Sequence, residues 1–161
     1  MKKLILLLLT FAFTSSLLAQ ETDSTNQELD KIAIKNLIEN FLTAAGNYDI
    51  EAISTMFTSK ANISGASLKN EKWNSYRMTI QEFITALKSD PNPKKYKEPV
   101  DNWIIHIDGR QLAFVRADAT LFREGKPQRH NIDYFTLVKE SEGWKILNGS
   151  YVSTPIQEKV K

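Results

Sequence analysis

The chain has 161 residues, 42% of them hydrophobic and 25% charged, and it contains no cysteine. Its 21 basic and 19 acidic residues give a formal charge of +2, and removal of Lys2 and Lys3 with a leader would leave 19 of each sign. These values exclude disulfides, thiolate nucleophiles and cysteine metal sites, and they give no reason to expect nucleic acid as a partner.

The first twenty residues have the layout of a secretory signal peptide, with two lysines, an apolar run from Leu4 to Phe13, and then small and polar residues. A membrane-spanning helix needs roughly 20 apolar residues, so this run is too short for an anchor. We therefore expect export to the periplasm or the medium, with cleavage after Ala19 or Gln20. Because no cysteine follows the run, we do not expect a lipoprotein, and we expect no membrane contact after cleavage.

The remaining chain is long enough for one domain. Residues 21–28 are polar and lack periodicity, which predicts a flexible leader. The domain is expected over residues 29–155, with a short tail at 156–161.

Three helices are predicted in the first part of the domain. The first has an apolar stripe at helical spacing and ends at Gly46-Asn47; its stripe is formed by Ile34, Leu37, Ile38, Phe41, Leu42 and Ala45. Asp49 can cap a short second helix, and residues 61–64 resemble a short strand. Thr79 and Glu82 have the spacing of a capping box, which predicts a third helix that stops before Pro91.

After Pro99 the sequence predicts four strands, at residues 100–107, 111–123, 128–139 and 144–152. Asp108-Gly109 suits a two-residue turn, and 124–127 and 140–143 read as four-residue loops. Helices followed by an antiparallel meander predict an α+β domain in which the three helices pack on one face of a curved sheet.

Turn lengths give an expected strand register, in which Asp118 faces Asp133. The inner face would then be apolar at Trp103, Ile105, Ile107, Leu112, Phe114, Phe122, Phe135, Leu137, Trp144 and Ile146. The same face would carry a polar group made of Asp101, Arg116, Asp118, Asn131, Asp133, Asn148 and Ser150. The outer face would consist of Ile104, His106, Ala113, Val115, Ala117, Ala119, Ile132, Tyr134, Thr136 and Leu147.

Two short motifs carry a family resemblance. The strand Asp133-Tyr134-Phe135-Thr136-Leu137-Val138-Lys139 is followed by Gly143-Trp144-Lys145-Ile146. Together with the order of helices and strands, they resemble the cone-shaped nuclear transport factor 2-like superfamily. That superfamily includes the SnoaL-like and ketosteroid-isomerase-like proteins and the branch described as "putative lumazine-binding".

The resemblance implies a pocket between sheet and helices, which in some relatives binds or isomerises small molecules and in others belongs to a plain scaffold. In the isomerases the base is an acid on the strand after the second helix, but the matching stretch here, Ile63–Ala66, has no carboxylate. Their second acid falls nearest Asn131 or Asp133. The missing first acid counts against steroid-isomerase chemistry.

A small-molecule pocket is therefore the main functional expectation, lined by Trp103, Arg116, Asp118, Asn131, Asp133, Phe135, Asn148 and Tyr76. Non-catalytic binding is the leading hypothesis. One alternative is a cofactor-free isomerase, hydratase or lyase with Asp133 or Asp118 as general acid or base. Arg116 could instead simply neutralise both aspartates. A third alternative is a scaffold whose pocket is filled by Trp73 or Tyr76.

No cofactor or metal is expected. His106 and His130 fall on the predicted outer face among alanine, valine and isoleucine, which do not ligate metals. An outer face this apolar seldom stays exposed on a monomer, so we expect a homodimer that packs sheet to sheet.

Overall fold

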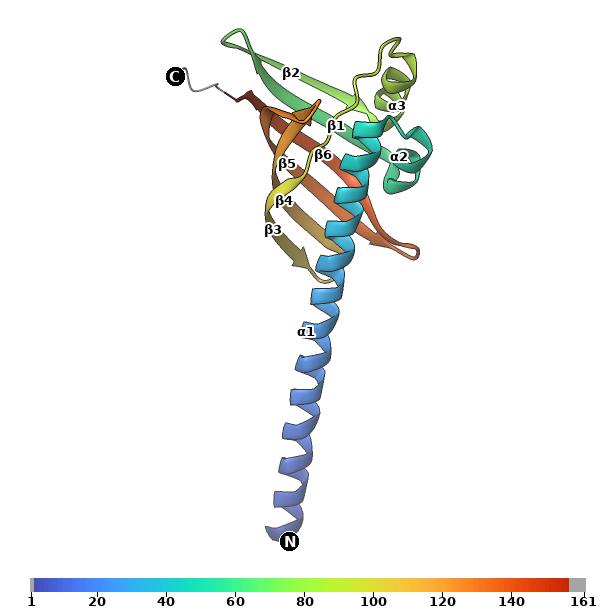
Figure 1. Ribbon diagram of the computed structural model, residues 1–161. Coiled ribbons are helices and arrows are strands. Elements are labelled where there is room, and N and C mark those ends of the chain that lie inside the picture. The colour runs from blue at the N-terminus through green and yellow to red at the C-terminus, as the bar shows by residue number, and fades with distance from the viewer. Residues whose placement is uncertain (1, 157–161) are drawn as a thin grey trace, which may run out of the picture.

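The computed structural model describes the backbone of residues 2–156 and the side chains of residues 25–156. Three helices and one six-stranded sheet form an α+β domain, which confirms the predicted fold class (Figure 1). The helices are α1 (Lys2–Asn47), α2 (Ile50–Met56) and α3 (Ile80–Ser89). The strands are β1 (Phe57–Lys69), β2 (Lys72–Thr79), β3 (Val100–Asp108), β4 (Leu112–Arg123), β5 (Lys126–Glu140) and β6 (Gly143–Pro155).

Helix α1 is longer than the sequence analysis predicts, because it continues through residues 21–28, where a flexible leader was expected. No glycine or proline occurs between residues 2 and 45, so nothing in the local sequence interrupts the helical hydrogen bonds. The predicted signal peptide lies outside the residues whose side chains are described, as do residues 157–161 of the tail, so these assignments stay predictions.

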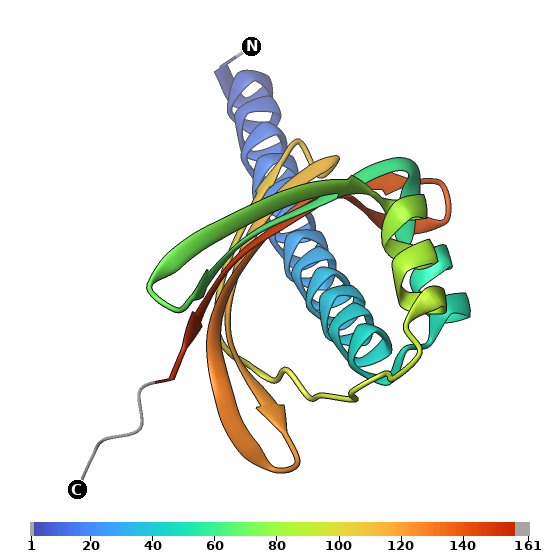
Figure 2. The ribbon, with the colours of Figure 1, turned by 90° about the horizontal axis from the view of Figure 1, so that it is seen from above.

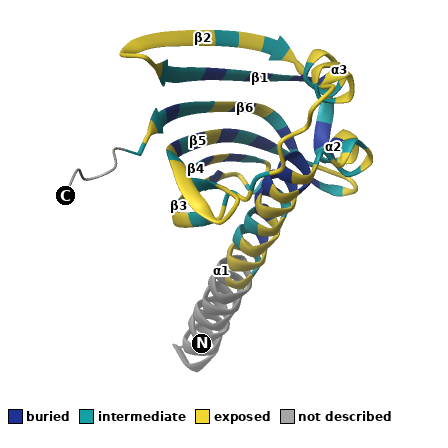
Figure 3. Cartoon of the chain, turned by 45° about the horizontal axis from the view of Figure 1, so that its top comes forward, coloured by how far each residue is buried: buried dark blue, intermediate teal, exposed yellow. Residues whose placement is uncertain are grey.

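The C-terminal half of α1 lies in the concavity of the curved sheet, with α2 and α3 at one end (Figure 2). Its predicted apolar stripe is confirmed: Ile34 and Ile38 are fully buried, and Phe41, Leu42 and Ala45 are less than a tenth exposed. These side chains form one core with the inner face of the sheet (Figure 3). The long helix is therefore held by packing of its apolar stripe.

The helix ends lie where the sequence predicts them, although the left-handed residue after α1 is Tyr48 and not Gly46 or Asn47. Helix α1 stops at Asn47, and the following residue, Tyr48, adopts the left-handed conformation with φ 62°. Asp49 caps α2 by accepting a hydrogen bond from the amide of Ala52 at 3.1 Å. Thr79 and Glu82 form the complete capping box of α3.

The sheet has the order β2-β1-β6-β5-β4-β3, with β1 parallel to β6 and every other pair antiparallel. The hairpin of β1 and β2 extends far beyond the predicted strand at 61–64. Strand β2 is mostly exposed and polar, so it lacks the alternation that marks a half-buried strand. Its turn, Asn70-Glu71, has positive φ at both positions, but glutamate is not a typical residue for that conformation.

The predicted register is wrong at the turn between β3 and β4. Asp108 pairs with Leu112, so the loop contains three residues, 109–111, instead of two. A shift of one residue turns every side chain of a strand to the opposite face. Strand β4 is therefore inverted relative to the prediction.

The next two turns are shorter than predicted, with two residues each, because Arg123 pairs with Lys126 and Glu140 with Gly143. Register irregularities between Leu121 and Phe122 and between Thr136 and Leu137 add further shifts. As a result Asp133 lies between Ala117 and Tyr151, rather than between Asp118 and Ser150.

The residues on the two faces of the sheet differ in part from the prediction. Asn131, Asp133, Phe135 and Leu137 are buried on the inner face as predicted. The small residues of β4 join them there instead of lining the outer face: Ala113, Val115, Ala117 and Ala119. The register puts on the outer face seven residues that were expected inside: Leu112, Phe114, Arg116, Asp118, Phe122, Asn148 and Ser150. Asp101 is exposed and accepts a hydrogen bond from Thr120.

Candidate ligand-binding pocket

A cavity of about 340 Å³ lies between the concave face of the sheet and helices α1 and α3. Its walls are largely aromatic, formed by Phe41, Phe57, Tyr76, Phe83, Tyr96, Phe135 and Tyr151. The rings of Phe41 and Phe135 meet edge to face, with centroids 6.0 Å apart, so helix and sheet are packed directly together beside the cavity. The helices supply only apolar side chains to this lining.

A cluster of polar side chains faces the cavity from β5 and from the segment that precedes β3. Asp133 is 5% exposed and Asn131 is 7% exposed. The Asn131 side-chain amide donates a hydrogen bond to Glu98 Oε1. Asn131 Oδ1 and Asp133 Oδ2 are buried and have no hydrogen-bond partner in the described part of the chain. Buried polar atoms are usually hydrogen-bonded, so these two unpaired oxygens mark the cluster as a candidate functional site.

The environment favours the neutral form of Asp133. Burial, together with the smaller effects of the nearby Glu98 and Asp118 charges, raises the pKa of Asp133 to about 8. Burial also raises the pKa of Glu98, while the hydrogen bond from Asn131 opposes that rise. At neutral pH Asp133 is therefore mostly a carboxylic acid, which can donate as well as accept a hydrogen bond.

Two tyrosines form one side of the cavity across the edge of the sheet. Tyr76 on β2 and Tyr151 on β6 both pair with Gly65 on the strand between them. The Tyr76 hydroxyl donates to the Tyr151 hydroxyl at 2.9 Å, and burial raises the pKa of Tyr76. A Cβ on Gly65 would lie 2.8 Å from the Tyr151 ring and 2.9 Å from the Tyr76 ring. Glycine is therefore needed for the two rings to approach over β1.

Arg129 on β5 lines the cavity but is tied to the sheet. Its guanidinium donates to Ser153 Oγ at 2.6 Å, to Ser67 Oγ at 3.0 Å, and to the carbonyls of Leu68 and Ser153 at 2.8 Å. In the described structure it contacts no carboxylate. The sequence analysis did not single out Arg129, since only the pairing of β1 with β6 brings its serine partners together.

The structure gathers only part of the predicted site. Tyr76, Asn131, Asp133 and Phe135 line the cavity as predicted. Trp103 is not part of the cavity lining; it lies beside helix α1, where the Lys35 ammonium is 5.9 Å from its ring centre.

Arg116, Asp118 and Asn148 lie on the outer face, so the expected inward pair of Asp118 and Asp133 is wrong. Arg116 Nε donates to Asp118 Oδ1 at 2.7 Å, and this hydrogen bond lowers the pKa of Asp118. Arg116 therefore neutralises Asp118 but not Asp133. The physical reason is the three-residue loop that inverts β4.

Glu98 and Tyr96 are site residues that the sequence analysis missed, because they lie between the third predicted helix and the first strand after Pro99, where no element was predicted. Backbone hydrogen bonds attach this segment at two places: Tyr96 to Gly46 at 3.1 Å, and Lys97 to Phe122 at 3.0 and 2.7 Å. A Cβ on Gly46 would be 2.3 Å from the Tyr96 carbonyl oxygen, so the close approach requires glycine there. The same segment separates the cavity from a wider hollow of about 860 Å³ on its other side.

Other predicted features do not contribute to the cavity. Trp73 is 57% exposed and does not fill it. His106 is hydrogen-bonded to Asp108 at 3.0 Å on the surface. Within residues 25–156 there is no group of three or more acidic or histidine side chains that could hold a metal ion. Among the helices whose side chains are described, none is long and apolar enough to cross a bilayer.

The helix-filled curved sheet and the pocket between sheet and helices define a nuclear transport factor 2-like protein. The chain belongs to the family described as "putative lumazine-binding", whose model matches residues 29–152. No curated protein was found that matches the chain.

Solved structures are similar in fold at low sequence identity. A nuclear transport factor 2-like protein of unknown function from Shewanella baltica is 19% identical, with 80% of this chain and 96% of that chain covered and a TM-score of 0.58. A nuclear transport factor 2-like protein from Novosphingobium aromaticivorans is 14% identical, with coverage of 86% and 90% and a TM-score of 0.65. A protein from the same organism that is described as the beta subunit of a "putative aromatic-ring-hydroxylating dioxygenase" is 9% identical, with coverage of 81% and 93% and a TM-score of 0.66. These likenesses establish the fold alone.

Proposed function

We propose that this protein binds a small molecule in the cavity between α1, α3 and the sheet, without catalysing a reaction on it. The observation that carries the proposal is the pair of buried oxygens without partners, Asp133 Oδ2 and Asn131 Oδ1, beside the cavity. A buried polar atom left unpaired costs about 1–3 kcal/mol. A bound ligand that supplies hydrogen bonds to these atoms would remove that cost.

The dimensions and lining of the cavity support the same function. Its volume of about 340 Å³ falls within the range of small-molecule sites, which is roughly 300–1,000 Å³. Such sites combine apolar walls with a few placed polar groups, and here seven aromatic side chains line the cavity together with the polar cluster.

Native mass spectrometry of the protein purified from the cells that produce it tests this function. We expect a folded species heavier than the polypeptide, which loses a small molecule on denaturation. The variant Asp133→Asn should retain less of that molecule, and the outer-face variant Asp118→Asn should retain as much as the wild type. An unliganded protein that also binds nothing in a fragment screen by thermal shift would refute the proposal.

A second candidate is acid–base catalysis by Asp133, favoured by its pKa of about 8. A group with this pKa is suited to exchange a proton near neutral pH, as a cofactor-free isomerase, hydratase or lyase requires. The strand segment Ile63–Ala66 supplies no second carboxylate, which is why binding remains the first choice. Turnover of a retained ligand with a pH–rate profile that disappears in Asp133→Asn would establish the enzyme instead.

Export and self-association complete the proposal. The signal-peptide layout of the first twenty residues supports export. Exposed apolar residues on the outer face, Ile104, Phe114 and Tyr134, support a homodimer formed through that face.

A further inference from the structure

We propose that the ligand of this cavity is a compact organic cation, such as an amine or amidine, whose N–H groups bind Asp133, Asn131 and Glu98. This inference rests on the proposed binding function and adds the chemical class of the ligand. It follows from the balance of donors and acceptors at the polar cluster, from the charges around it, and from the aromatic walls.

Acceptors outnumber available donors at the cluster. Two carboxyl groups and the Asn131 carbonyl oxygen meet there, while the Asn131 amide already donates to Glu98. The one O–H that neutral Asp133 brings is lost when a cation binds and the carboxyl group ionises. The Tyr76 hydroxyl is likewise committed, because it donates to Tyr151. A guest with several N–H donors would therefore complement the cluster better than one that brings further carbonyl or carboxylate oxygens.

The cluster also lacks a cation of its own in the described structure. Helices α1 and α3 face it with apolar side chains only, Phe41, Leu42, Ala45 and Phe83. The other titratable groups of the lining are the two acids, three tyrosines and two arginines: Asp133, Glu98, Tyr76, Tyr96, Tyr151, Arg123 and Arg129. Arg129 is bound to serines and backbone, and Arg123 is exposed, so neither forms an ion pair with an acid.

A bound cation would change the protonation of the site. Asp133 is mostly neutral in the free protein because its charge would be buried without a partner. A positive group within hydrogen-bonding distance favours the ionised form, so binding would be accompanied by release of a proton. Hydrogen bonds to charged partners are stronger than those between neutral groups.

The walls suit the same class of ligand. Aromatic faces attract ammonium and amidinium groups through their negative ring faces. The cavity of about 340 Å³ has room for a ring-bearing cation, since a cavity of about 150 Å³ already holds benzene.

Three probes of one shape and different charge test the inference: benzamidine, benzamide and benzoate, measured by titration calorimetry. We expect benzamidine to bind at least about tenfold more tightly than benzamide, and benzoate to bind least. The affinity for benzamidine should rise between about pH 6 and about pH 9, because Asp133, whose pKa is about 8, loses its proton while the amidine stays charged. Heats measured in buffers of different ionisation enthalpy should reveal proton release near neutral pH.

Variants locate the site of binding. Asp133→Asn and, independently, Glu98→Gln should each lower the affinity for benzamidine by about tenfold or more, with Asp118→Asn within about twofold of the wild type. If benzamide or benzoate binds as tightly as benzamidine, the proposal that the ligand is a cation is refuted, while the proposed binding function stands. Benzamidine binding that is unchanged in Asp133→Asn and Glu98→Gln would overturn the placement. If none of the three binds and native mass spectrometry finds no retained molecule, both proposals fail.

Discussion

Among single residues, Asp133 shows how far the surroundings of a side chain can change its chemistry. The same residue type at position 118 is half-buried, paired with Arg116, and has a lowered pKa. Asp133 has no charged partner and is 5% exposed, so burial raises its pKa to about 8. The difference between the two aspartates comes from the face of the sheet on which each lies.

This raised pKa predicts a specific dependence of stability on pH. Between the ordinary value of 3.8 and the folded value of about 8, the folded protein holds a proton that the unfolded chain releases. The contribution of Asp133 to the free energy of unfolding is therefore fully present below about pH 4 and falls as the pH rises to about 8. Asp133→Asn should flatten this fall and be more stable than the wild type at pH 8, by an amount on the order of a few kcal/mol.

Urea denaturation at about pH 5 and about pH 8 measures the effect. Some pH dependence of the same sign should persist in the variant, because burial also raises the pKa of Glu98. Asp118→Asn is the matched control, and it should not share the gain at pH 8. Identical pH profiles for wild type and Asp133→Asn would contradict the assignment.

Gly65 allows a second prediction for a single residue. The substitution Gly65→Ala places a methyl group less than 3.0 Å from two tyrosine rings, so Tyr76 and Tyr151 must move. We expect a loss of about 1–3 kcal/mol in the free energy of unfolding. At Gly149 an added Cβ would lie 3.5 Å from Phe135, an ordinary contact, so Gly149→Ala is the control and should cost less. Equal losses in the two variants would rule out a special role for the tyrosine pair.

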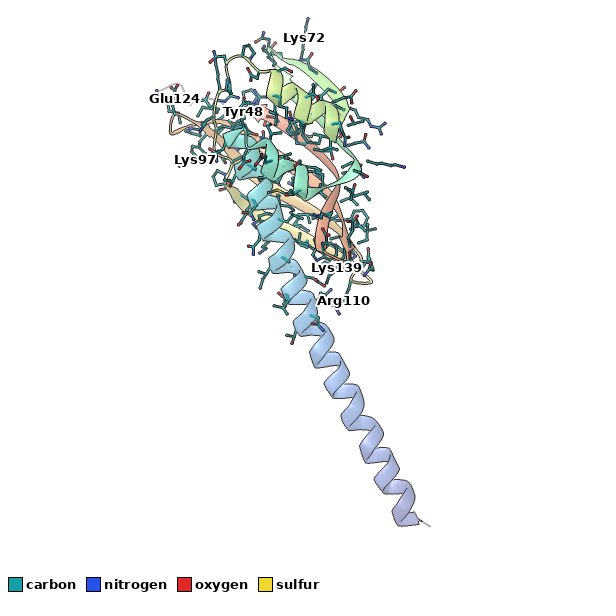
Figure 4. The ribbon with its side chains drawn as sticks, turned by 90° about the vertical axis from the view of Figure 1, so that its right-hand side faces the viewer. Tyr48, Lys72, Lys97, Arg110, Glu124 and Lys139 are labelled. Atoms are coloured by element: carbon teal, nitrogen blue, oxygen red, sulfur yellow. The ribbon has the colours of Figure 1, made fainter. Side chains whose placement is uncertain are left out.

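At the scale of elements, one buried carboxylate attaches helix α1 to the end of the sheet that carries the β3–β4 and β5–β6 turns. Asp30 is 5% exposed and accepts hydrogen bonds from Lys139, from Arg110 at 3.3 Å, and from the Trp144 indole at 3.1 Å. Burial alone would raise the pKa of Asp30, but these three donors hold it below its usual value. Arg110 and Lys139 lie together beside α1 at this end of the sheet (Figure 4).

Removal of this attachment should weaken the whole fold. Asp30→Asn leaves two cations without their shared anion, and breaking a partly buried ion pair from one side costs on the order of 3 kcal/mol. Denaturation of Asp30→Asn against Glu28→Gln provides the comparison. Glu28 forms an exposed pair with Lys31 on the same helix, so its loss should cost less than about 1 kcal/mol. A small effect of Asp30→Asn would mean that the apolar stripe alone holds the helix.

The pH dependence of this attachment has the opposite sign to that of Asp133. Because the folded pKa of Asp30 is lowered, its contribution is present above the ordinary value of 3.8 and is lost as the pH falls through the folded pKa. Lowering the pH should therefore weaken the attachment of α1 to the sheet. Raising the pH should instead reduce the stabilising contribution of Asp133 in the cavity.

For the whole molecule, the outer face of the sheet predicts self-association. Ile104, Phe114 and Tyr134 are 57%, 47% and 45% exposed and line one shallow hollow. Phe114→Glu should convert a dimer into monomers, measured by analytical ultracentrifugation, because a charge would then be buried between the two copies. Trp73→Glu, which removes an equally exposed ring from β2, should leave the dimer intact. A wild type that sediments as a monomer would exclude this interface.

The sequence by itself determined the features that depend on neighbouring residues. Capping by Asp49 and Thr79, the apolar stripe of α1 and the strands after Pro99 are all present as predicted. Asp133 was also placed correctly on the inner face, although the reasoning through Asp118 was wrong. Local signals of this kind work because caps and periodicity act within a few residues of the chain.

Only the tertiary structure decided how the strands meet and therefore which side chains form the site. One additional residue in the loop at 109–111 inverts β4, which removes Arg116 and Asp118 from the pocket. Glu98 enters it because the segment before β3 is held to α1 and β4 by backbone hydrogen bonds. Strand register and long-range pairing depend on groups far apart in the chain, so the polar cluster can be identified only from the arrangement of the sheet around the helix.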